Sequence, residues 1–310
     1  MDPAWEWING PPPSLAELED RAMAAYNPSR AGPGSAGIAV RLDGFVAIAI
    51  QERARSGLLE SDAEGPEAAR ALLDWVLHGQ EEAAPYPIRR QETRGHPDQV
   101  AVLHGERPLA AFPTTDRRES WLVFPGSFNP FHRGHARLAE VAHEMTGLPV
   151  DFELSIRNVD KPPLHFRAIA ERIRGLLEHP GRSHFHGPAW LTSAPTFLEK
   201  ARAFPGPVRF IVGMDTILRI GDPRYYRDAV DCARTLDELA GELQATFLAF
   251  PRNRGDGRLS GPEELSGLPP RLRAITEVVP ADRVRDVLDI SSSRIRAAAS
   301  GTLPATPGPD

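Results

Sequence analysis

The sequence predicts an α/β protein in which a doubly wound parallel sheet is preceded by a smaller α+β region. Beyond about residue 120, short runs of β-forming residues alternate with helical patterns, as in a parallel sheet with helices on both faces. Earlier in the chain, a hairpin signal stands between two helical segments. A chain of 310 residues accommodates about two domains, and we expect them at residues 1–118 and 119–310.

The first region is expected to contain two helices around a hairpin. Leu15–Tyr26 is an alanine-rich helical segment, and a second helix starts at Gly65, where apolar residues recur on one face. Between them, Gly37–Ile50 forms two β-like runs split by Asp43-Gly44, a dipeptide that favours a type I′ turn. Residues 79–118 are rich in charge, proline and glycine, which predicts a linker apart from one short apolar patch at Val100–Leu103.

The second region alternates between strand and helix patterns from its start to its end. The expected strands are Trp121–Phe124, Val150–Ile156, Ala189–Thr192, Val208–Val212, Phe247–Phe250 and Ile275–Val279. The clearest helical patterns are Ala136–Met145, His165–Glu178 and Ser292–Ala299. Ligands of such a sheet bind outside the carboxyl ends of its strands, so the loops that follow strands are where we look for a site.

Composition excludes several classes of function. The net charge is −6, so no overall basic field would attract nucleic acid or an acidic membrane surface. No apolar run reaches the roughly 20 residues that span a bilayer. The single cysteine, Cys232, excludes an internal disulfide and fits a reducing compartment, and we expect it to be a buried, unreactive side chain. The sequence therefore predicts a cytoplasmic protein, and it leaves a homo-oligomer open.

Lysine is rare in this chain, since only Lys161 and Lys200 among 36 basic side chains are lysines. A lysine in so arginine-rich a chain indicates a place where a compact ammonium group is needed and a guanidinium will not fit. Lys161 follows the second expected strand of the second region and is such a candidate. Lys200 lies in a charged helical segment, and we expect its side chain to be solvated.

The stretch FPGSFNPFHRGH, Phe124 to His135, follows the first strand of the second region and precedes a helix. Gly126 lets the backbone approach a ligand, and the free N–H groups of the helix N-terminus form a natural phosphate site. His132 and His135 lie on one side of the first helical turn, and Gly134 removes the side chain that would stand between them. Two exposed histidines in a turn are the structural alternative, but the combination favours a nucleotide site.

This stretch resembles the first signature of the HxGH-type nucleotidyltransferase superfamily. That superfamily includes nicotinamide and nicotinate mononucleotide adenylyltransferases, pantetheine phosphate adenylyltransferase and the cytidylyltransferases. Its second signature, I-S-S-T-x-x-R, is similar to Ile290–Arg296, where Ser293 replaces threonine and keeps the hydroxyl. On its own, such a run is a helix N-cap with a solvated arginine. The resemblance covers about residues 119–302 and implies a Rossmann-like fold.

Three further segments resemble parts of the superfamily's site. Asp215, in VGMDT, matches an aspartate that holds the adenosine ribose in relatives, although a helix N-cap is the alternative. Arg252, in FPR at a strand end, matches an arginine near the adenine, although an ordinary loop arginine is the alternative. Lys161, in NVDKPP, matches a lysine that meets the phosphates.

The resemblance implies transfer of an adenylyl group from ATP to the phosphate of a mononucleotide, with release of pyrophosphate. The implied catalytic residues are His132, His135, Lys161 and Arg296. The implied ATP-binding residues are Gly126, Ser127, Phe128, Gly134, Gly213, Asp215, Arg252, Ser292 and Ser293. Asn158 and Thr196 are candidates for the acceptor site. No metal-binding carboxylate cluster is expected, since Mg²⁺ would bind mainly through the ATP phosphates and water.

The combined segments are similar to a subgroup in which a CinA-like N-terminal region precedes an adenylyltransferase-like domain linked to nicotinamide mononucleotide. A role in NAD biosynthesis is therefore expected. Other acceptors stay open, namely nicotinate mononucleotide, phosphopantetheine or a phosphorylated alcohol with CTP, as does a nucleotide-binding regulator without turnover. The N-terminal region resembles only the second half of the CinA C-terminal domain. It lacks the Glu-Ser-x-Thr-Gly-Gly stretch of relatives, so no deamidase activity is expected.

Overall fold

The computed structural model describes residues 13–28, 31, 35–78, 83–115, 119–157, 162–253, 259–285, 290 and 295. The chain divides into two compact units. The first unit holds Met1–His104 together with Asp160–Ile169, and the second holds Gly105–Val159 together with Ala170–Asp310. A short piece of the second half of the chain thus belongs to the first unit, and the domain boundary after residue 118 stays a prediction.

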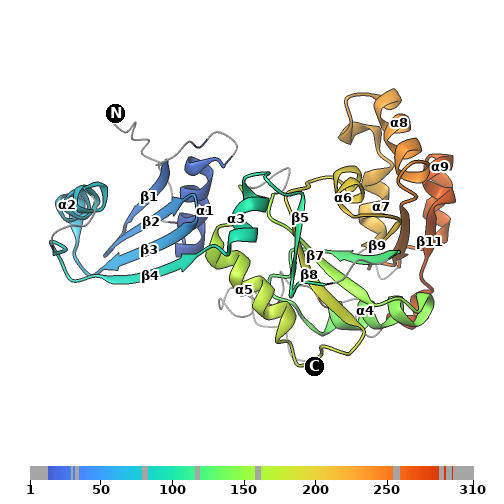
Figure 1. Ribbon diagram of the computed structural model, residues 1–310, viewed down its shortest axis with the longest axis horizontal. Coiled ribbons are helices and arrows are strands. Elements are labelled where there is room, and N and C mark those ends of the chain that lie inside the picture. Colours follow the sequence, from blue (N-terminus) through green and yellow to red (C-terminus); the bar gives the residue numbers. More distant parts are fainter. Residues whose placement is uncertain are drawn as a thin grey trace, which may run out of the picture. The chain divides into compact units, whose positions relative to one another are not determined.

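An antiparallel sheet of four strands is the centre of the first unit (Figure 1). Its order is β1-β2-β3-β4, with the bounds Ala36–Leu42, Val46–Glu52, Arg55–Ser61 and Arg89–Arg94. The helices of this unit are α1 (Leu15–Tyr26), α2 (Gly65–Leu77) and α3 (Pro97–Leu103). Both predicted helices and the predicted hairpin are therefore confirmed.

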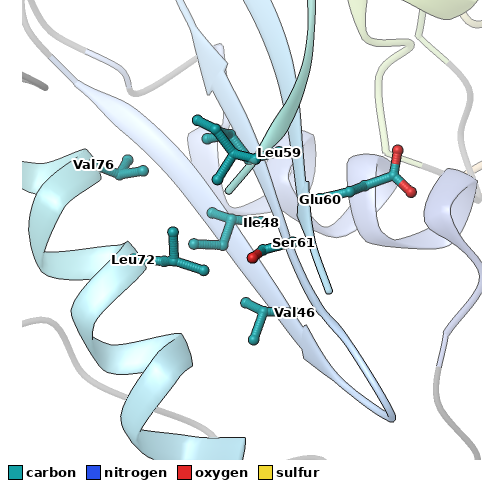
Figure 2. A pocket seen from close by; sticks show the side chains of 8 residues that line it. Val46, Ile48, Leu59, Glu60, Ser61, Leu72 and Val76 are labelled. Atoms are coloured by element: carbon teal, nitrogen blue, oxygen red, sulfur yellow. The ribbon is translucent and has the colours of Figure 1, made fainter. Parts of the chain in front are cut away.

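Helices α1 and α2 pack on opposite faces of this sheet. Because successive side chains of a strand point to opposite faces, Ala47 and Ala49 of β2 pack with the buried side chains of α1. Val46 and Ile48 of the same strand pack with those of α2. Figure 2 shows Leu72 of α2 facing Val46 and Ile48 across this apolar layer. The first unit thus has two small hydrophobic cores, one on each face of its sheet.

Two predictions for this region are wrong. Three residues, Asp43 to Phe45, separate the paired ends of β1 and β2. Only Gly44 among them has a positive φ, 64°, whereas a type I′ turn needs two such residues. The linker predicted at residues 79–118 contains β4, α3 and β5 (Leu109–Phe112). Strand β4 has the sequence RRQETR and lies exposed at the sheet edge, so it lacks the apolar alternation that signals a strand.

Seven strands form the sheet of the second unit, in the order β11-β10-β9-β6-β7-β8-β5. Six of them are parallel, with the bounds Trp121–Pro125 (β6), Val150–Ser155 (β7), His186–Thr192 (β8), Val208–Gly213 (β9), Thr246–Phe250 (β10) and Thr276–Val278 (β11). Strand β5 pairs antiparallel with β8 at the edge. Numbered from β6, the parallel strands have the spatial order 3-2-1-4-5-6, which is a doubly wound Rossmann-like sheet. The predicted fold class and its six strands are confirmed.

Helices cover both faces of this sheet, with the bounds Arg133–Thr146 (α4), Phe166–Leu177 (α5), Phe197–Ala203 (α6), Met214–Ile220 (α7), Ala229–Ala240 (α8) and Pro270–Ala274 (α9). Short 3₁₀ helices lie at Pro223–Tyr225, Pro262–Gly267 and Ala281–Arg283. Along β6, Leu122 and Phe124 pack with α4 and α5, whereas Trp121 and Val123 pack with α6, α7 and α8. The predicted helix Ser292–Ala299 falls outside the described residues except for Ile295.

The strand order creates one place where neighbouring strands lead to opposite faces. Strands β6 and β9 are adjacent, but the helix after β6 packs on one face and the helix after β9 on the other. The loops therefore diverge outside the carboxyl ends of these two strands, and ligands of doubly wound sheets bind in the crevice formed there. The FPGSFNPFHRGH stretch follows β6 and the VGMDT segment follows β9, so both predicted motifs lie at this position.

The prediction that Lys200 is solvated is wrong. Its residue is 5% exposed, and its ammonium group lies 2.8 and 2.7 Å from the two carboxylate oxygens of Glu153, a residue of β7 that is fully buried. Thr192 of β8 donates a further hydrogen bond of 2.5 Å to the same carboxylate. The sequence around Lys200 predicts a charged, exposed helix. It gives no sign that Lys200 faces Glu153, a buried carboxylate on a strand.

None of the helices in the described ranges combines the length and hydropathy of a membrane span.

Candidate active site

The loop after β6 is shaped by an aromatic side chain that turns inward. Phe128 has a φ of +45° and is 1% exposed. Its ring lies directly over Gly126, where an added Cβ would come within 2.7 Å of the ring. Gly126 is expected to let the backbone approach a ligand, but the described contact that requires a glycine there is with Phe128. The predicted roles of Gly126, Ser127 and Phe128 in ATP binding stay predictions.

His132 and His135 form a stacked pair at the start of α4. Their ring centroids are 3.7 Å apart, and the planes are inclined by 24°. The backbone N–H of His132 donates a hydrogen bond to Nδ1 of His135 at 3.3 Å. The His135 ring also lies against the rings of Phe124, Phe128 and Phe131, at centroid distances of 5.9, 5.1 and 5.3 Å. The pair is therefore not two exposed turn histidines.

Burial disfavours the protonated form of both imidazoles. It lowers the pKa of His135 to about 3, helped by repulsion from His132 when that ring is protonated and from Arg252. It also lowers the pKa of His132, with contributions from His179 and Arg252. Because Nδ1 of neutral His135 accepts the backbone hydrogen bond, the proton must be on Nε2. His135 thus offers one N–H donor, and Nδ1 of His132 is buried without a hydrogen-bond partner among the described residues.

Gly134 brings the two predicted signatures together. A Cβ at this position would lie 3.0 Å from the His132 ring and 3.4 Å from Cβ of Ile290. Ile290 is the first residue of the ISSSRIR segment, 155 positions after His135 in the chain. It packs in the same apolar cluster as Phe128 and Phe131. The start of the second signature therefore lies beside the histidine pair, separated from it by a residue without a side chain.

Asp215 and Arg252 meet above Gly213. The Arg252 Nε donates to Oδ1 of Asp215 at 3.3 Å, and a Cβ at Gly213 would lie 2.4 Å from that oxygen and 2.8 Å from that nitrogen. Gly213, not Asp215, is the N-cap of α7, so the N-cap alternative for Asp215 is wrong. Both side chains are more than half exposed, which makes the pair worth little to stability and leaves it accessible to a ligand.

The backbone of Arg252 is fixed by Ser260, a residue that the sequence analysis missed. The N–H of Arg252 donates to Oγ of Ser260 at 2.7 Å, and the N–H of Ser260 donates to the carbonyl of Arg252 at 2.9 Å. Ser260 is 5% exposed.

His179 is a second residue that the sequence did not reveal. Its ring centroid lies 4.9 Å from that of Phe131, and its charge contributes to the lowered pKa of His132. Neither residue stands in a recognisable motif, so the chain pattern carried no signal for them.

Five predicted site residues lie outside the described residues: Asn158, Lys161, Ser292, Ser293 and Arg296. Thr196 is described and exposed, and it caps α6, accepting from the N–H of Glu199 at 3.3 Å and donating to its carboxylate at 2.7 Å. A contact of Thr196 with an acceptor stays a prediction. The structure thus brings together the glycines and histidines of the first signature, the start of the second, and the Asp215–Arg252 pair.

The model of the cytidylyltransferase-like family matches residues 123–298, more than half of the chain. The chain belongs to the cytidylyltransferase-like family. The match includes the site residues just described, from the end of β6 to the ISSSRIR segment. Membership supports nucleotidyltransferase activity for this cytidylyltransferase-like protein, as the resemblance of its two signatures implied.

Solved structures similar to this cytidylyltransferase-like protein include nicotinic acid mononucleotide adenylyltransferase of Plasmodium falciparum in two complexes. The complex with APC has a TM-score of 0.39 and 15% identity, and the complex with NaAD has a TM-score of 0.40 and 16% identity. In both, the match covers 58% of this chain and 83% of the other. No curated protein matches the chain. The family assignment therefore rests on the family model and on the fold and motifs described above.

Proposed function

We propose that this protein transfers the adenylyl group of ATP to the phosphate of nicotinamide mononucleotide and releases pyrophosphate. The observation that carries the proposal is the neutral, stacked pair of His132 and His135 at the N-terminus of α4, where the sheet changes winding direction. A helix N-terminus in that position attracts phosphate through free N–H groups and the helix dipole. The pair adds a side-chain donor at the same place.

The acceptor phosphate is already an anion, so the reaction needs no general base. A phosphate oxygen of the mononucleotide attacks the α-phosphorus of ATP, the bond to the bridging oxygen breaks, and pyrophosphate takes the electron pair. Catalysis then depends on alignment of the two phosphates and on donors that meet the charge developing on the bridging oxygen. We assign Nε2–H of His135 to such a donor position and His132 to a second one.

The remaining assignments follow from the resemblance, and those of Asp215 and Arg252 also from the geometry. Asp215 is exposed at the end of β9 and is assigned to the ribose hydroxyls of ATP. Arg252 lies beside it and is assigned to the nucleotide near the adenine. Lys161 and Arg296 are assigned to the triphosphate on the resemblance alone, as are Ser292 and Ser293 to its terminal phosphate.

Magnesium enters this proposal as part of the substrate, MgATP. Among the described residues, no group of three or more histidine, cysteine, aspartate or glutamate side chains is arranged to hold a metal ion. Mg²⁺ commonly keeps several waters and binds through substrate phosphates with few protein ligands. The residues present are therefore compatible with a metal carried by the nucleotide.

The choice of acceptor rests on the segments around the site, which resemble the subgroup linked to nicotinamide mononucleotide and hence to NAD biosynthesis. The single cysteine, Cys232, is 3% exposed, and a lone buried thiol fits the cytoplasmic location that we propose.

The second candidate function is the same type of transfer with other substrates. Because the matching family is described as cytidylyltransferase-like, CTP with a phosphorylated alcohol must be tested as a substrate pair. A third candidate is a nucleotide-binding regulator without turnover.

One experiment separates the three candidates. The full chain is incubated with Mg²⁺, with ATP or CTP, and with nicotinamide mononucleotide, nicotinate mononucleotide, phosphopantetheine or a phosphorylated alcohol. Pyrophosphate release is measured, and the product is identified by mass. We expect turnover with ATP and nicotinamide mononucleotide. Turnover only with another pair changes the substrate assignment, and ATP binding without pyrophosphate in any mixture contradicts catalysis.

A further inference from the structure

We propose that Glu153 and Lys200 are positioning residues for the acceptor side of the candidate active site, and that they act through Thr192 on the loop of residues 193–196. This loop joins β8 to α6 and ends at Thr196, the candidate acceptor-site residue. All of these residues belong to the second unit. The kinetic part of the proposal rests on the proposed function, whereas the structural part does not.

Glu153 lies between two loops at the carboxyl ends of the strands. It is a residue of β7, which pairs with β6 on one side and with β8 on the other. Its carbonyl accepts a hydrogen bond of 2.9 Å from the N–H of Gly126, in the loop after β6. Its carboxylate accepts a hydrogen bond of 2.5 Å from the hydroxyl of Thr192, the last residue of β8. One buried residue thus holds the loop after β6 through its backbone and the end of β8 through its side chain.

Thr192 extends this contact into the loop after β8. Its hydroxyl donates to the carboxylate of Glu153 and accepts from the N–H of Ala194 at 3.3 Å. Oγ of Ser155, at the end of β7, lies 2.9 Å from the carbonyl of Ala194 and can donate to it. Ala194 is 8% exposed, whereas Thr196 is exposed. The loop is therefore anchored at Ala194, two residues before the candidate acceptor-site residue.

Lys200 fixes the carboxylate to which Thr192 donates. Its ammonium group lies 2.8 and 2.7 Å from the two carboxylate oxygens of Glu153, so the carboxylate cannot rotate without weakening both contacts. Thr196 caps α6, the helix that carries Lys200. The ion pair therefore ties the start of α6 to β7, and a single carboxylate holds the loop of residues 193–196 from both of its ends.

Stability alone does not explain a buried ion pair at this place. Removing two charges from water is costly, and a buried pair can often be replaced by apolar side chains without loss of stability. A compact ammonium is also uncommon in this chain, since only two of 36 basic side chains are lysines. Lys200 is 5% exposed, and the larger, planar guanidinium of arginine would not fit the same contact. A need for one defined position of the loop explains the pair better.

The test uses the full chain and separates the position of the loop from stability. Lys200→Met with Glu153→Leu removes both charges but keeps the backbone carbonyl that accepts from Gly126. Thr192→Val removes only the hydroxyl, and Thr192→Ser keeps it. Leu272→Ala is the control, because Leu272 is fully buried on α9, which contacts β11 at the far edge of the sheet from β8.

Hydrogen–deuterium exchange of residues 193–196 is followed without substrate, stability is measured by urea unfolding, and kinetics are measured separately for ATP and nicotinamide mononucleotide. We expect the double variant and Thr192→Val to raise exchange in the loop roughly 2- to 10-fold, as on loss of one ordinary hydrogen bond. Both should lower kcat/KM for nicotinamide mononucleotide by up to about 100-fold, as when a binding group is displaced by about 1 Å.

The KM for ATP should stay near the wild-type value in these variants, because the contact of Glu153 with the loop after β6 is made by its backbone. Thr192→Ser should behave as wild type in exchange and in kinetics. Leu272→Ala should lower the urea midpoint and leave both loop exchange and acceptor kinetics unchanged.

Wild-type loop exchange in a stable double variant overturns the proposal, whatever reaction the protein catalyses. Equal effects of Thr192→Val and Thr192→Ser overturn it as well, as does an increase in loop exchange in Leu272→Ala that matches the double variant. A KM for ATP that rises as much as the KM for the acceptor contradicts a role on the acceptor side.

Two further outcomes leave the test decisive. If the double variant is much less stable than wild type, the comparison of the two Thr192 variants decides. If wild type releases no pyrophosphate with any acceptor, the proposed function fails, and the exchange measurement alone decides this inference.

Discussion

The carboxyl-terminal ends of β9 and β10 are joined by the hydrogen bond from Arg252 to Asp215, 3.3 Å long, directly above Gly213. The two side chains leave no room for a Cβ on Gly213. Because both side chains are exposed, the absence of a side chain at position 213 matters for the geometry of the pair and little for stability.

We therefore expect Gly213→Ala to impair nucleotide binding in a folded protein. The added methyl group must displace the Asp215 carboxylate or the Arg252 guanidinium, because it would lie within 2.8 Å of both. The KM for ATP should rise more than kcat falls. Steady-state kinetics and ATP titration check this, with Gly267→Ala as the control, since a Cβ there meets nothing within 4 Å. An unchanged KM for ATP would show that the pair does not bind the nucleotide.

A second prediction concerns which nitrogen of His135 serves the reaction. The side-chain amide of glutamine reaches the position of Nε2, whereas that of asparagine reaches the position of Nδ1. His135→Asn and His135→Ala should lose at least about 100-fold in kcat, as when one donor of an electrostatic site is removed. His135→Gln should retain more activity than either.

The control for that series is His184→Ala, which removes an exposed histidine of the same unit. Thermal unfolding must accompany the kinetics, because the His135 ring packs between three phenylalanine rings. Equal activity of His135→Gln and His135→Asn would remove the assignment of Nε2 as a donor.

A third prediction concerns the buried pair of Lys200 and Glu153. Lys200→Met leaves a buried carboxylate without its cation, which typically costs about 3–5 kcal/mol. The double variant Lys200→Met with Glu153→Leu removes both charges and should recover most of that loss. Urea unfolding of the single and double variants measures the difference. A single variant as stable as wild type would contradict the contact.

A fourth prediction concerns pH. Burial lowers the pKa of His135 to about 3 and, together with the charge of Arg182, lowers that of His186 to about 4. An unfolded histidine titrates near 6.5. As the pH falls from about 6.5 toward about 4, the unfolded chain takes up protons that the folded chain does not. Stability should therefore decline over that interval.

The variant His186→Phe checks the direction of this effect. Phenylalanine cannot take up a proton in either state, so the free energy of unfolding should fall less steeply with acid than in wild type. Urea unfolding at a series of pH values between about 4 and 7 measures both slopes. Parallel curves would mean that His186 is not the source of the dependence.

The sequence predicts the fold class and the first signature well because both follow from local patterns. Buried parallel strands are short apolar runs, and the glycine–histidine stretch needs no partner from elsewhere in the chain to be recognised. The same reasoning fails for β4, whose polar side chains are exposed at a sheet edge, and for Lys200, whose partner is Glu153 on a distant strand. Phe128 shows a third kind of failure, since an apolar residue in a polar loop gives no sign that it turns into the core.

Within the first unit, the guanidinium of Arg167 at the start of α5 donates to both carboxylate oxygens of Glu19, a buried residue of α1. This contact has a consequence for synthesis of the chain. The carboxylate emerges from the ribosome 148 residues before its cation, and at about 5–20 residues per second this delay is roughly 7–30 s. During that time α1 carries a charge that cannot be buried at low cost, and Ser56 of β3 lacks the hydrogen bond that the backbone N–H of Phe166 donates to its Oγ. The N-terminal part of this protein therefore leaves the ribosome first but acquires its last native contacts only when the start of α5 has been made.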